Sequence, residues 1–406
     1  MKKVYLCIDL KTFFASCECS ERHLDPFKTN LVVADPTRGN GALCLAITPQ
    51  MKSMGIHNRC RIFEIPKGVE YITAMPRMHL YMEYSARIYR IYCRYVSPDD
   101  IHVYSIDECF IDITSYMHLY HKSAKEFAKM LMQAVFADTH ITATCGIGTN
   151  LYLAKVALDI ISKHTKENIG ILDEERYQKH LWHHLPITDF WHMGSGTANH
   201  LLKLGVVDMH GITQIPEEIL YKEFGINAEY IIDHAWGREP ATIASIKKYR
   251  PKNESINNSQ VLFSDYEYED AILVVKEMVE LNVLRLVESR LVTNHISLYI
   301  GYSRTDGGGW AGGSRKLTVR TSSLSVLMDA FISIYHLKVQ KGRLIRQISI
   351  SFGDVLDEAY ESYDLFSDIE ALEEEKKLQK AIVSIRHKYG KNAILKLMNK
   401  QEKATT

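Results

Sequence analysis

The first apolar run of the chain ends on a carboxylate. Residues Val4–Ile8 are apolar or aromatic without interruption, and Asp9 follows them directly. Such a run indicates a strand buried on both faces, at the centre of a sheet. A carboxylate in a buried strand region loses hydration, at a free-energy cost of several kcal/mol unless something neutralises it. The fold must therefore supply a partner for Asp9, and a bound cation is the usual one.

Two further acids lie in a predicted β-hairpin. The strand-like segments Ile101–Ser105 and Cys109–Ile113 flank Asp107 and Glu108. Together with Asp9, these carboxylates offer only oxygen ligands, which select hard cations, magnesium before zinc. The alternative is an exposed hairpin tip, where acidic residues are common. The apolar strand before Asp9 favours the metal site.

Composition limits the class of protein. A chain of 406 residues exceeds one compact core and predicts about two to four domains. Its 46% hydrophobic and 24% charged residues are ordinary for a soluble globular protein. We expect no membrane span and no export signal, and therefore a cytoplasmic protein. The eight scattered cysteines do not have the spacing of zinc ligands.

Charge is segregated along the chain although the formal net charge is zero. Residues 338–346 carry four basic and no acidic side chains, whereas residues 356–375 carry nine acidic and no basic ones. The balance argues against a uniformly basic coat for nucleic acid, but it allows local basic surfaces.

The order of predicted elements is typical of an α+β fold. We expect strands at 4–9, 31–35, 101–105, 109–113 and 142–147, with helices at 13–18, 48–54, 81–95, 123–137 and 151–163. This order predicts helices on one face of a mainly antiparallel sheet. Residues from about 168 to 238 are predicted to be all helical. A second α+β domain is expected from a helix at 270–288 and strands at 294–302, 315–320 and 344–352.

Three motifs resemble those of the Y-family translesion DNA polymerases, most closely the UmuC-like branch. They are IDLKTFFASCE at Ile8–Glu18, YSIDECFID at Tyr104–Asp112, and CGIGTN followed by LAKVA and an acid within Cys145–Asp159. Their order and intervals also fit, so the resemblance covers at least residues 1 to about 350. It implies an error-prone, template-directed DNA polymerase of DNA repair, damage tolerance and the SOS response.

The resemblance implies a right-hand α+β polymerase with a palm, small fingers, a helical thumb and a C-terminal little finger. The predicted boundaries are 1–10 and 71–167 for the palm, 11–70 for the fingers, 168–238 for the thumb, 239–252 for a linker, 253–355 for the little finger and 356–406 for a charged helical tail.

The resemblance also implies two-metal phosphoryl transfer with two Mg²⁺ ions. One ion would lower the pKa of the primer 3′-hydroxyl, and the other would neutralise the triphosphate. Glu18 is interpreted as a surface residue and Asp112 as a sheet-edge residue, not as ligands. The implied ligands are the carboxylates and one backbone carbonyl: Asp9, Leu10, Asp107 and Glu108.

The incoming nucleotide has its own candidate residues. Phe14 falls at the family's steric gate, where its ring would collide with a 2′-hydroxyl; alternatively it is a core residue, as the register favours for Phe13. Lys52 aligns with the basic residue of the finger helix, and Pro49 replaces a tyrosine of other branches. An isolated helical lysine is otherwise a solvated residue. The dNTP-binding candidates are Phe13, Phe14, Thr48, Lys52 and Lys155.

Candidate DNA contacts lie later in the chain. Gly194 and Gly196 resemble a helix-hairpin-helix turn whose backbone N–H groups bind phosphate, although His192 stands where a glycine is usual; a glycine turn between two core helices is the alternative. Alternating basic residues predict a sheet face along duplex phosphates, or else ordinary solvated strand faces. These residues are Arg315, Lys316, Arg320, Arg343 and Arg346.

The implied partners are primer-template DNA and dNTPs, with no membrane. The Leu365–Phe366 region loosely resembles a sliding-clamp peptide, although Ser362 replaces its glutamine and a contact with the tail helix would explain it equally well. A recombinase filament or an accessory subunit is a further candidate partner.

Two rival functions use the same motifs. A nucleotidyl cyclase shares the strand aspartate and the hairpin, but it would need neither a helix-hairpin-helix nor a basic sheet. A structural DNA-binding protein with a decayed active site is the other rival, and the intact carboxylates argue against it.

Overall fold

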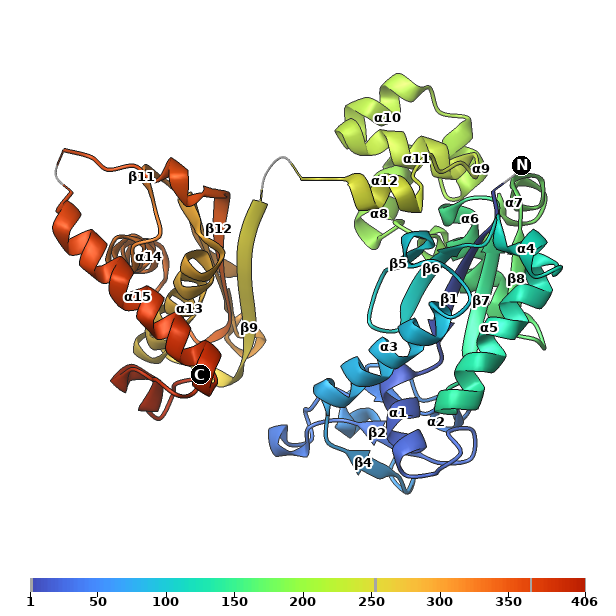
Figure 1. Ribbon diagram of the computed structural model, residues 1–406, viewed down its shortest axis with the longest axis horizontal. Coiled ribbons are helices and arrows are strands. Elements are labelled where there is room, and N and C mark those ends of the chain that lie inside the picture. Colours follow the sequence, from blue (N-terminus) through green and yellow to red (C-terminus); the bar gives the residue numbers. More distant parts are fainter. Residues whose placement is uncertain (1–2, 252–253, 366, 406) are drawn as a thin grey trace. The chain divides into compact units, whose positions relative to one another are not determined.

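The computed structural model describes residues 3–251, 254–365 and 367–405 (Figure 1). Parts of the predicted linker and little finger (252–253), Phe366 of the predicted clamp peptide and the last tail residue lie outside these ranges. The chain divides into two compact units, Met1–Tyr249 and Arg250–Thr406. No helix in the described ranges is both long and apolar enough to span a bilayer.

The first unit is built around a five-stranded sheet in the order β5-β6-β1-β7-β8. The first apolar run forms the central strand, β1 (Tyr5–Leu10), as its composition predicts. It pairs antiparallel with β6 (Glu108–Asp112) and β7 (Ala143–Gly148). The edges are β5 (Ile101–Val103), antiparallel to β6, and β8 (Ile169–Leu172), parallel to β7.

Helices cover both faces of this sheet, whereas the sequence predicted one covered face. Leu6 and Ile8 pack toward α3 (Met78–Tyr92) and α5 (Ala124–Thr139). Tyr5 and Cys7 point the other way, because side chains alternate along a strand, and belong to a cluster with helical residues of 151–158 and 243. An uninterrupted apolar strand needs both covers.

Two glycines allow the second cover to approach closely. A Cβ on Gly146 would lie 2.0 Å from the Ala154 carbonyl oxygen, and one on Gly148 would lie 2.1 Å from the Ala154 nitrogen. This space is filled by α6 (Leu151–Val156), which continues directly into a π-helical turn, Ala157–Ile161. The close approach of this helix therefore explains the two glycines of the third motif.

A small sheet and two helices extend from one end of the large sheet. Its strands are β2 (Leu31–Val33), β3 (Ala46–Ile47) and β4 (Ile72–Ala74), in the order β3-β2-β4. The helices are α1 (Phe13–Glu21) and α2 (Pro49–Ser53). A short helix, α4 (Tyr116–Leu119), precedes α5.

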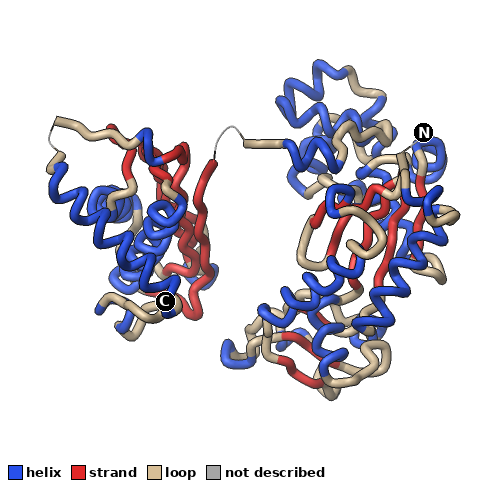
Figure 2. The backbone as a smooth tube through the Cα atoms, in the orientation of Figure 1, coloured by secondary structure: helices blue, strands red, loops and turns tan. Residues whose placement is uncertain are grey.

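The rest of the first unit is a helical cluster with its own core (Figure 2). Its helices are α7 (Glu174–Leu181), α8 (Ser195–Lys203), α9 (Met209–Thr213), α10 (Glu217–Phe224) and α11 (Ala228–Ala235). The prediction that residues 168–238 are all helical is wrong at β8. The short apolar run Ile169–Leu172 completes the large sheet, and Gly170 lets it lie against Ala157.

The predicted linker is partly helical. α12 (Ile243–Lys248) begins within it, because the Thr242 hydroxyl accepts a hydrogen bond from the Ser245 N–H and the Ser245 hydroxyl caps the Thr242 N–H in return.

The second unit has a four-stranded antiparallel sheet in the order β11-β10-β12-β9. Two helices, α13 (Tyr268–Ser289) and α14 (Leu324–Lys338), share its core, and α15 (Ile369–Tyr389) packs against α13. The strands are β9 (Glu254–Tyr266), β10 (Leu291–Tyr302), β11 (Trp310–Thr321) and β12 (Ile345–Asp357). β9 was not predicted, because its sequence is polar and one of its faces is open.

Candidate active site

Strand register brings the three predicted catalytic carboxylates to one end of the large sheet. Asp9 on β1 lies directly opposite Glu108 on β6. The Asp107 carbonyl accepts a hydrogen bond from the Leu10 N–H at 3.0 Å, which fixes the hairpin against the end of β1. Residues about a hundred positions apart therefore converge because the hairpin pairs in this register.

The three carboxylates are incompletely neutralised by the protein. Burial, reinforced by the charges of Asp107 and Glu108, raises the pKa of Asp9 to about 7, and Lys155 opposes the shift only in part. Lys155 Nζ lies 2.7 Å from Glu108 Oε1, and the Cys7 thiol donates to the same oxygen at 3.0 Å. Within the described ranges, the Asp9 carboxylate has no hydrogen bond or ion pair.

This donor set fits a hard divalent cation. It consists of carboxylate oxygens and carries excess negative charge. The Ser105 hydroxyl donates a hydrogen bond to Asp107 Oδ1 at 2.6 Å. Such a hydrogen bond orients a ligand without satisfying its charge. Repulsion that raises a buried carboxylate's pKa is relieved by a cation between the oxygens.

The aromatic pair after Asp9 divides into a buried and a half-buried ring. Phe13 is only 3% exposed and belongs to the core. Phe14 is half-buried and stacks on the ring of Tyr81, with ring centroids 4.5 Å apart and an interplanar angle of 16°. The arrangement follows the register that the sequence favoured, with Phe13 facing inward.

The interpretation of Glu18 as a surface residue is wrong, since it is completely buried. Its carboxylate accepts hydrogen bonds from the Tyr81 hydroxyl at 2.7 Å and from Arg77 Nε and Nη2 at 3.0 and 2.7 Å, and it pairs with Arg22. Burial by itself would raise the pKa of Glu18, but these donors hold it below its usual value. Glu18 thus anchors the tyrosine on which Phe14 stacks.

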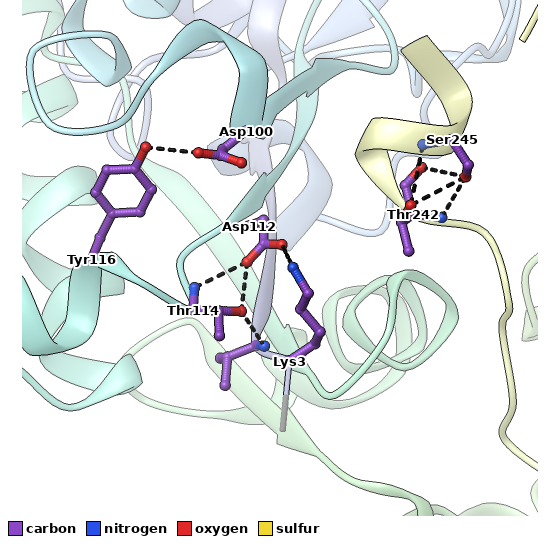
Figure 3. Close-up of polar contacts among 8 residues, drawn as sticks. Lys3, Asp100, Asp112, Thr114, Tyr116, Thr242 and Ser245 are labelled. Atoms are coloured by element: carbon purple, nitrogen blue, oxygen red, sulfur yellow. Dashed lines mark hydrogen bonds and ion pairs between the residues drawn. The ribbon is translucent and has the colours of Figure 1, made fainter. Parts of the chain in front are cut away.

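Asp112 was interpreted as a sheet-edge residue, and this is also wrong. It lies in β6, an inner strand, and is 8% exposed. Its carboxylate pairs with Lys3 Nζ at 2.7 Å and accepts a hydrogen bond from the Thr114 N–H at 3.0 Å (Figure 3). Because Asp112 ends the strand that Glu108 begins, it lies at the opposite end of the sheet from the carboxylate cluster.

Lysines interact electrostatically with Asp9 or with one another near it, including two that sequence reasoning missed. Desolvation lowers the pKa of Lys52, and the charges of Asp9, Lys163 and Lys11 all act on its ammonium. Lys163 lies 3.9 Å from Asp159 and Lys11 donates to Asn168 Oδ1 at 2.6 Å. Lys11 could have been found from its position two residues after Asp9; Lys163 follows the π-helical turn, which gives no sequence signal.

The contacts of Thr48 do not fit the triphosphate-binding role suggested for it. Its side chain is completely buried. The hydroxyl donates to the Thr29 carbonyl at 2.7 Å and accepts from the Leu31 N–H at 3.2 Å. These bonds tie α2 to β2, so Thr48 holds the segment that carries Lys52.

The candidate DNA-binding residues differ in whether other residues of the protein already bind them. Gly194 caps α8 and Gly196 lies in its first turn, and a Cβ at either position would meet no atom within 4 Å. Arg315 and Lys316 are exposed on β11. The remaining candidates already have partners: Arg320 donates to the Asp354 carbonyl, Arg343 pairs with Asp306 and Arg346 with Asp265.

Comparisons with known proteins agree on the family. Residues 8–159 match the impB/mucB/samB family. The chain is 30% identical over 400 residues to the putative UV-damage repair protein UvrX of Bacillus subtilis (strain 168), covering 98% of this chain and 94% of the relative. It is 27% identical to DNA polymerase IV 2 of the same organism over 97% and 94% of the two chains.

A solved structure shares the fold. The Y-family DNA polymerase chimera Dbh-Dpo4(243-245)-Dbh matches 87% of this chain and 99% of its own length, with a TM-score of 0.66 and 18% identity. The matches to DNA polymerase IV relatives, together with this shared fold, define a DNA-directed DNA polymerase. The chain belongs to the Y-family of translesion polymerases, in its UmuC-like branch, and members of this family depend on divalent metal ions.

Proposed function

We propose that Asp9, Asp107 and Glu108 are the catalytic carboxylates with which this polymerase adds dNTPs to a primer 3′-hydroxyl, using two Mg²⁺ ions. The observation that carries the proposal is the β1–β6 register, which sets Asp9 opposite Glu108 and leaves their charge without a full protein partner. When bound, the cations would activate the 3′-hydroxyl and neutralise the triphosphate.

The chain's own residues position the reactants. The three carboxylates and the Leu10 carbonyl would hold the cations, and Lys155 orients Glu108 through their 2.7 Å contact. Lys52 and Lys11 each interact electrostatically with Asp9, Lys163 acts on Lys52, and the three ammonium groups attract the triphosphate.

Sugar selection rests on an aromatic stack. The Phe14 ring lies beneath the sugar and excludes a 2′-hydroxyl sterically. Its stacking on Tyr81 and the Tyr81–Glu18 hydrogen bond support the proposal, because they hold the ring against displacement.

We also propose the domain assignment expected from the sequence, with a palm, fingers, thumb, linker, little finger and tail. β8 pairs with the palm sheet, so the thumb begins beyond Leu172. Gly194 and Gly196 are proposed to bind a DNA phosphate at the start of α8. A sliding clamp is proposed to bind near Leu365, whose side chain is 99% exposed; Phe366 lies outside the described residues.

Primer extension on a templated oligonucleotide with Mg²⁺ tests the proposed chemistry. We expect templated addition of dNTPs. A nucleotidyl cyclase would release a cyclic nucleotide without needing a template, and a decayed polymerase would bind the primer-template without extending it. Either of these results would overturn the proposal.

The proposed role of the little finger in DNA binding is tested by the salt dependence of the DNA affinity. Replacing Arg315 and Lys316 together by alanine should reduce the slope of log affinity against log salt by about two, because about two phosphate contacts are lost. A matched control replaces Lys377 and Lys391, exposed in and after α15, by alanine. Equal slopes for the two double variants would mean that β11 does not contact the phosphates.

A further inference from the structure

Three side chains with metal-binding atoms gather in the helical part of the first unit, outside the carboxylate cluster. His183 lies in the turn after α7, Asp208 precedes α9, and His210 lies in the first turn of α9. One ligand atom from each lies within 4.8 Å of the other two. The His183 Nδ1 to Asp208 Oδ2 distance is 2.8 Å, and the two imidazole centroids are 4.9 Å apart.

Backbone contacts hold these side chains in place. Asp208 caps α9, with Oδ1 accepting from the Gly211 N–H at 2.7 Å, so that Oδ2 remains directed at His183. The His210 N–H donates to the Trp182 carbonyl at 3.1 Å, which fastens α9 to the turn that carries His183. The Trp182 indole in turn donates to the Ala235 carbonyl at 2.8 Å. The ligand atoms are thus brought together by a framework that needs no cation to form.

The surroundings leave one side of the cluster open. The Asp208 side chain is 17% exposed, whereas that of His183 is 71% exposed. The Asp208 carboxylate is faced by the imidazoles of both histidines, whose unprotonated nitrogens bind a metal ion.

We propose that His183, Asp208 and His210 bind one divalent transition-metal cation of the zinc type. Two imidazole nitrogens and one carboxylate oxygen are a set that Zn²⁺ and Co²⁺ prefer over Mg²⁺. Water completes the coordination on the open side. The cation takes the position of the proton between His183 and Asp208, and the Gly211 N–H remains on Oδ1 as the outer contact that orients the carboxylate.

The site differs in kind from the carboxylate cluster and does not depend on its chemistry. The cluster of Asp9, Asp107 and Glu108 selects hard cations through oxygen ligands alone, while the histidine site selects borderline cations. A cation there joins the end of α7 to the start of α9. It would stabilise the helical region against unfolding without taking part in nucleotide addition.

The test uses the full-length protein, freed of metal by a chelator and then kept in excess Mg²⁺ so that the carboxylate cluster is occupied. Co²⁺ is titrated while its visible absorption is followed, and Zn²⁺ binding is measured by calorimetry. We expect one equivalent of Co²⁺ to bind, to be displaced by Zn²⁺, and to raise the unfolding temperature.

Variants test whether the three residues bind this one equivalent of Co²⁺. His183→Ala and His210→Ala should each weaken binding at least about tenfold, since loss of a ligand exceeds the effect of losing an outer contact. Asp208→Asn should weaken it similarly, although asparagine keeps the helix cap and hence the fold. The matched control is His184→Ala, because His184 is the next residue and pairs with Asp189 instead.

The proposal is overturned if the wild-type protein binds no Co²⁺ beyond the His183→Ala, His210→Ala double variant. It is equally overturned if His184→Ala removes as much binding as the ligand variants. The three residues would then form only a hydrogen-bonded helix cap.

Discussion

Two carboxylates of the first unit, Asp9 and Glu18, lie nine residues apart in sequence and have opposite surroundings. Glu18 receives hydrogen bonds from Tyr81 and Arg77 and an ion pair from Arg22, and its pKa is held below its usual value. Asp9 lies beside Asp107 and Glu108, and burial with their repulsion raises its pKa to about 7. Glu18 is completely buried and Asp9 is half-buried, but only Glu18 is neutralised by the chain.

The difference separates a structural acid from one prepared for a ligand. A folded protein tolerates a buried charge when donors surround it, as at Glu18. Where repulsion persists, as at Asp9, the folded state retains a free-energy cost that a cation can remove. The contrast therefore supports the proposed metal site more strongly than the presence of acids alone.

The largest expected effect is on catalysis. Asp107→Asn and Glu108→Gln should each reduce primer extension at least about a thousandfold, because loss of several kcal/mol of metal-based stabilisation corresponds to that factor. Steady-state extension with Mg²⁺ measures it. DNA affinity should change little; activity above about a tenth of wild type in both variants would contradict the assignment.

Glu18 should behave in the opposite way, through stability. Glu18→Gln should lower the free energy of unfolding by about 2–3 kcal/mol, less than for a fully buried pair because Arg77 and Arg22 are partly exposed. Chemical denaturation measures this loss. The control is Glu21→Gln, since Glu21 is exposed and accepts a hydrogen bond from the Tyr84 hydroxyl; this variant should change stability by less than about 0.5 kcal/mol.

The neighbouring residues Phe13 and Phe14 are expected to differ in the same way, one acting in stability and the other in sugar selection. Phe14→Ala should raise the efficiency of ribonucleotides relative to dNTPs about 10- to 100-fold, since a steric clash of about 1–3 kcal/mol is removed. Phe13→Leu should lower stability and leave this ratio unchanged, because Phe13 is buried in the core. If Phe14→Ala leaves the ratio unchanged, sugar selection resides elsewhere.

The sequence predicted the fold class and the central strand because apolar strands and motif order are local signals. It could not predict that Glu18 is buried, since its partners Arg77 and Tyr81 come from α3, far along the chain. It also missed β8 and β9, which are a very short apolar run and a polar strand, so that pairing partners decide their structure. Thr48 was assigned from its neighbours, although its hydroxyl is bonded to β2 and the preceding loop.

The candidate site was predictable to a similar extent. The motifs pointed to Asp9, Asp107 and Glu108, and the strand register places them together. Lys163 was missed because a π-helical turn shifts its position around the helix axis relative to a regular α-helix. Residue types alone gave no sign of that shift.

The most direct test of the contrast is the free energy of unfolding with and without Mg²⁺, measured by chemical denaturation. For the wild-type protein we predict a gain of about 1–2 kcal/mol with Mg²⁺ above its dissociation constant. Asp9→Asn should be more stable than wild type in chelator, because repulsion is relieved, and should gain less from Mg²⁺. Glu18→Gln should be less stable yet keep the full Mg²⁺ gain. An equal Mg²⁺ gain in wild type and Asp9→Asn, or none in either, would contradict the account.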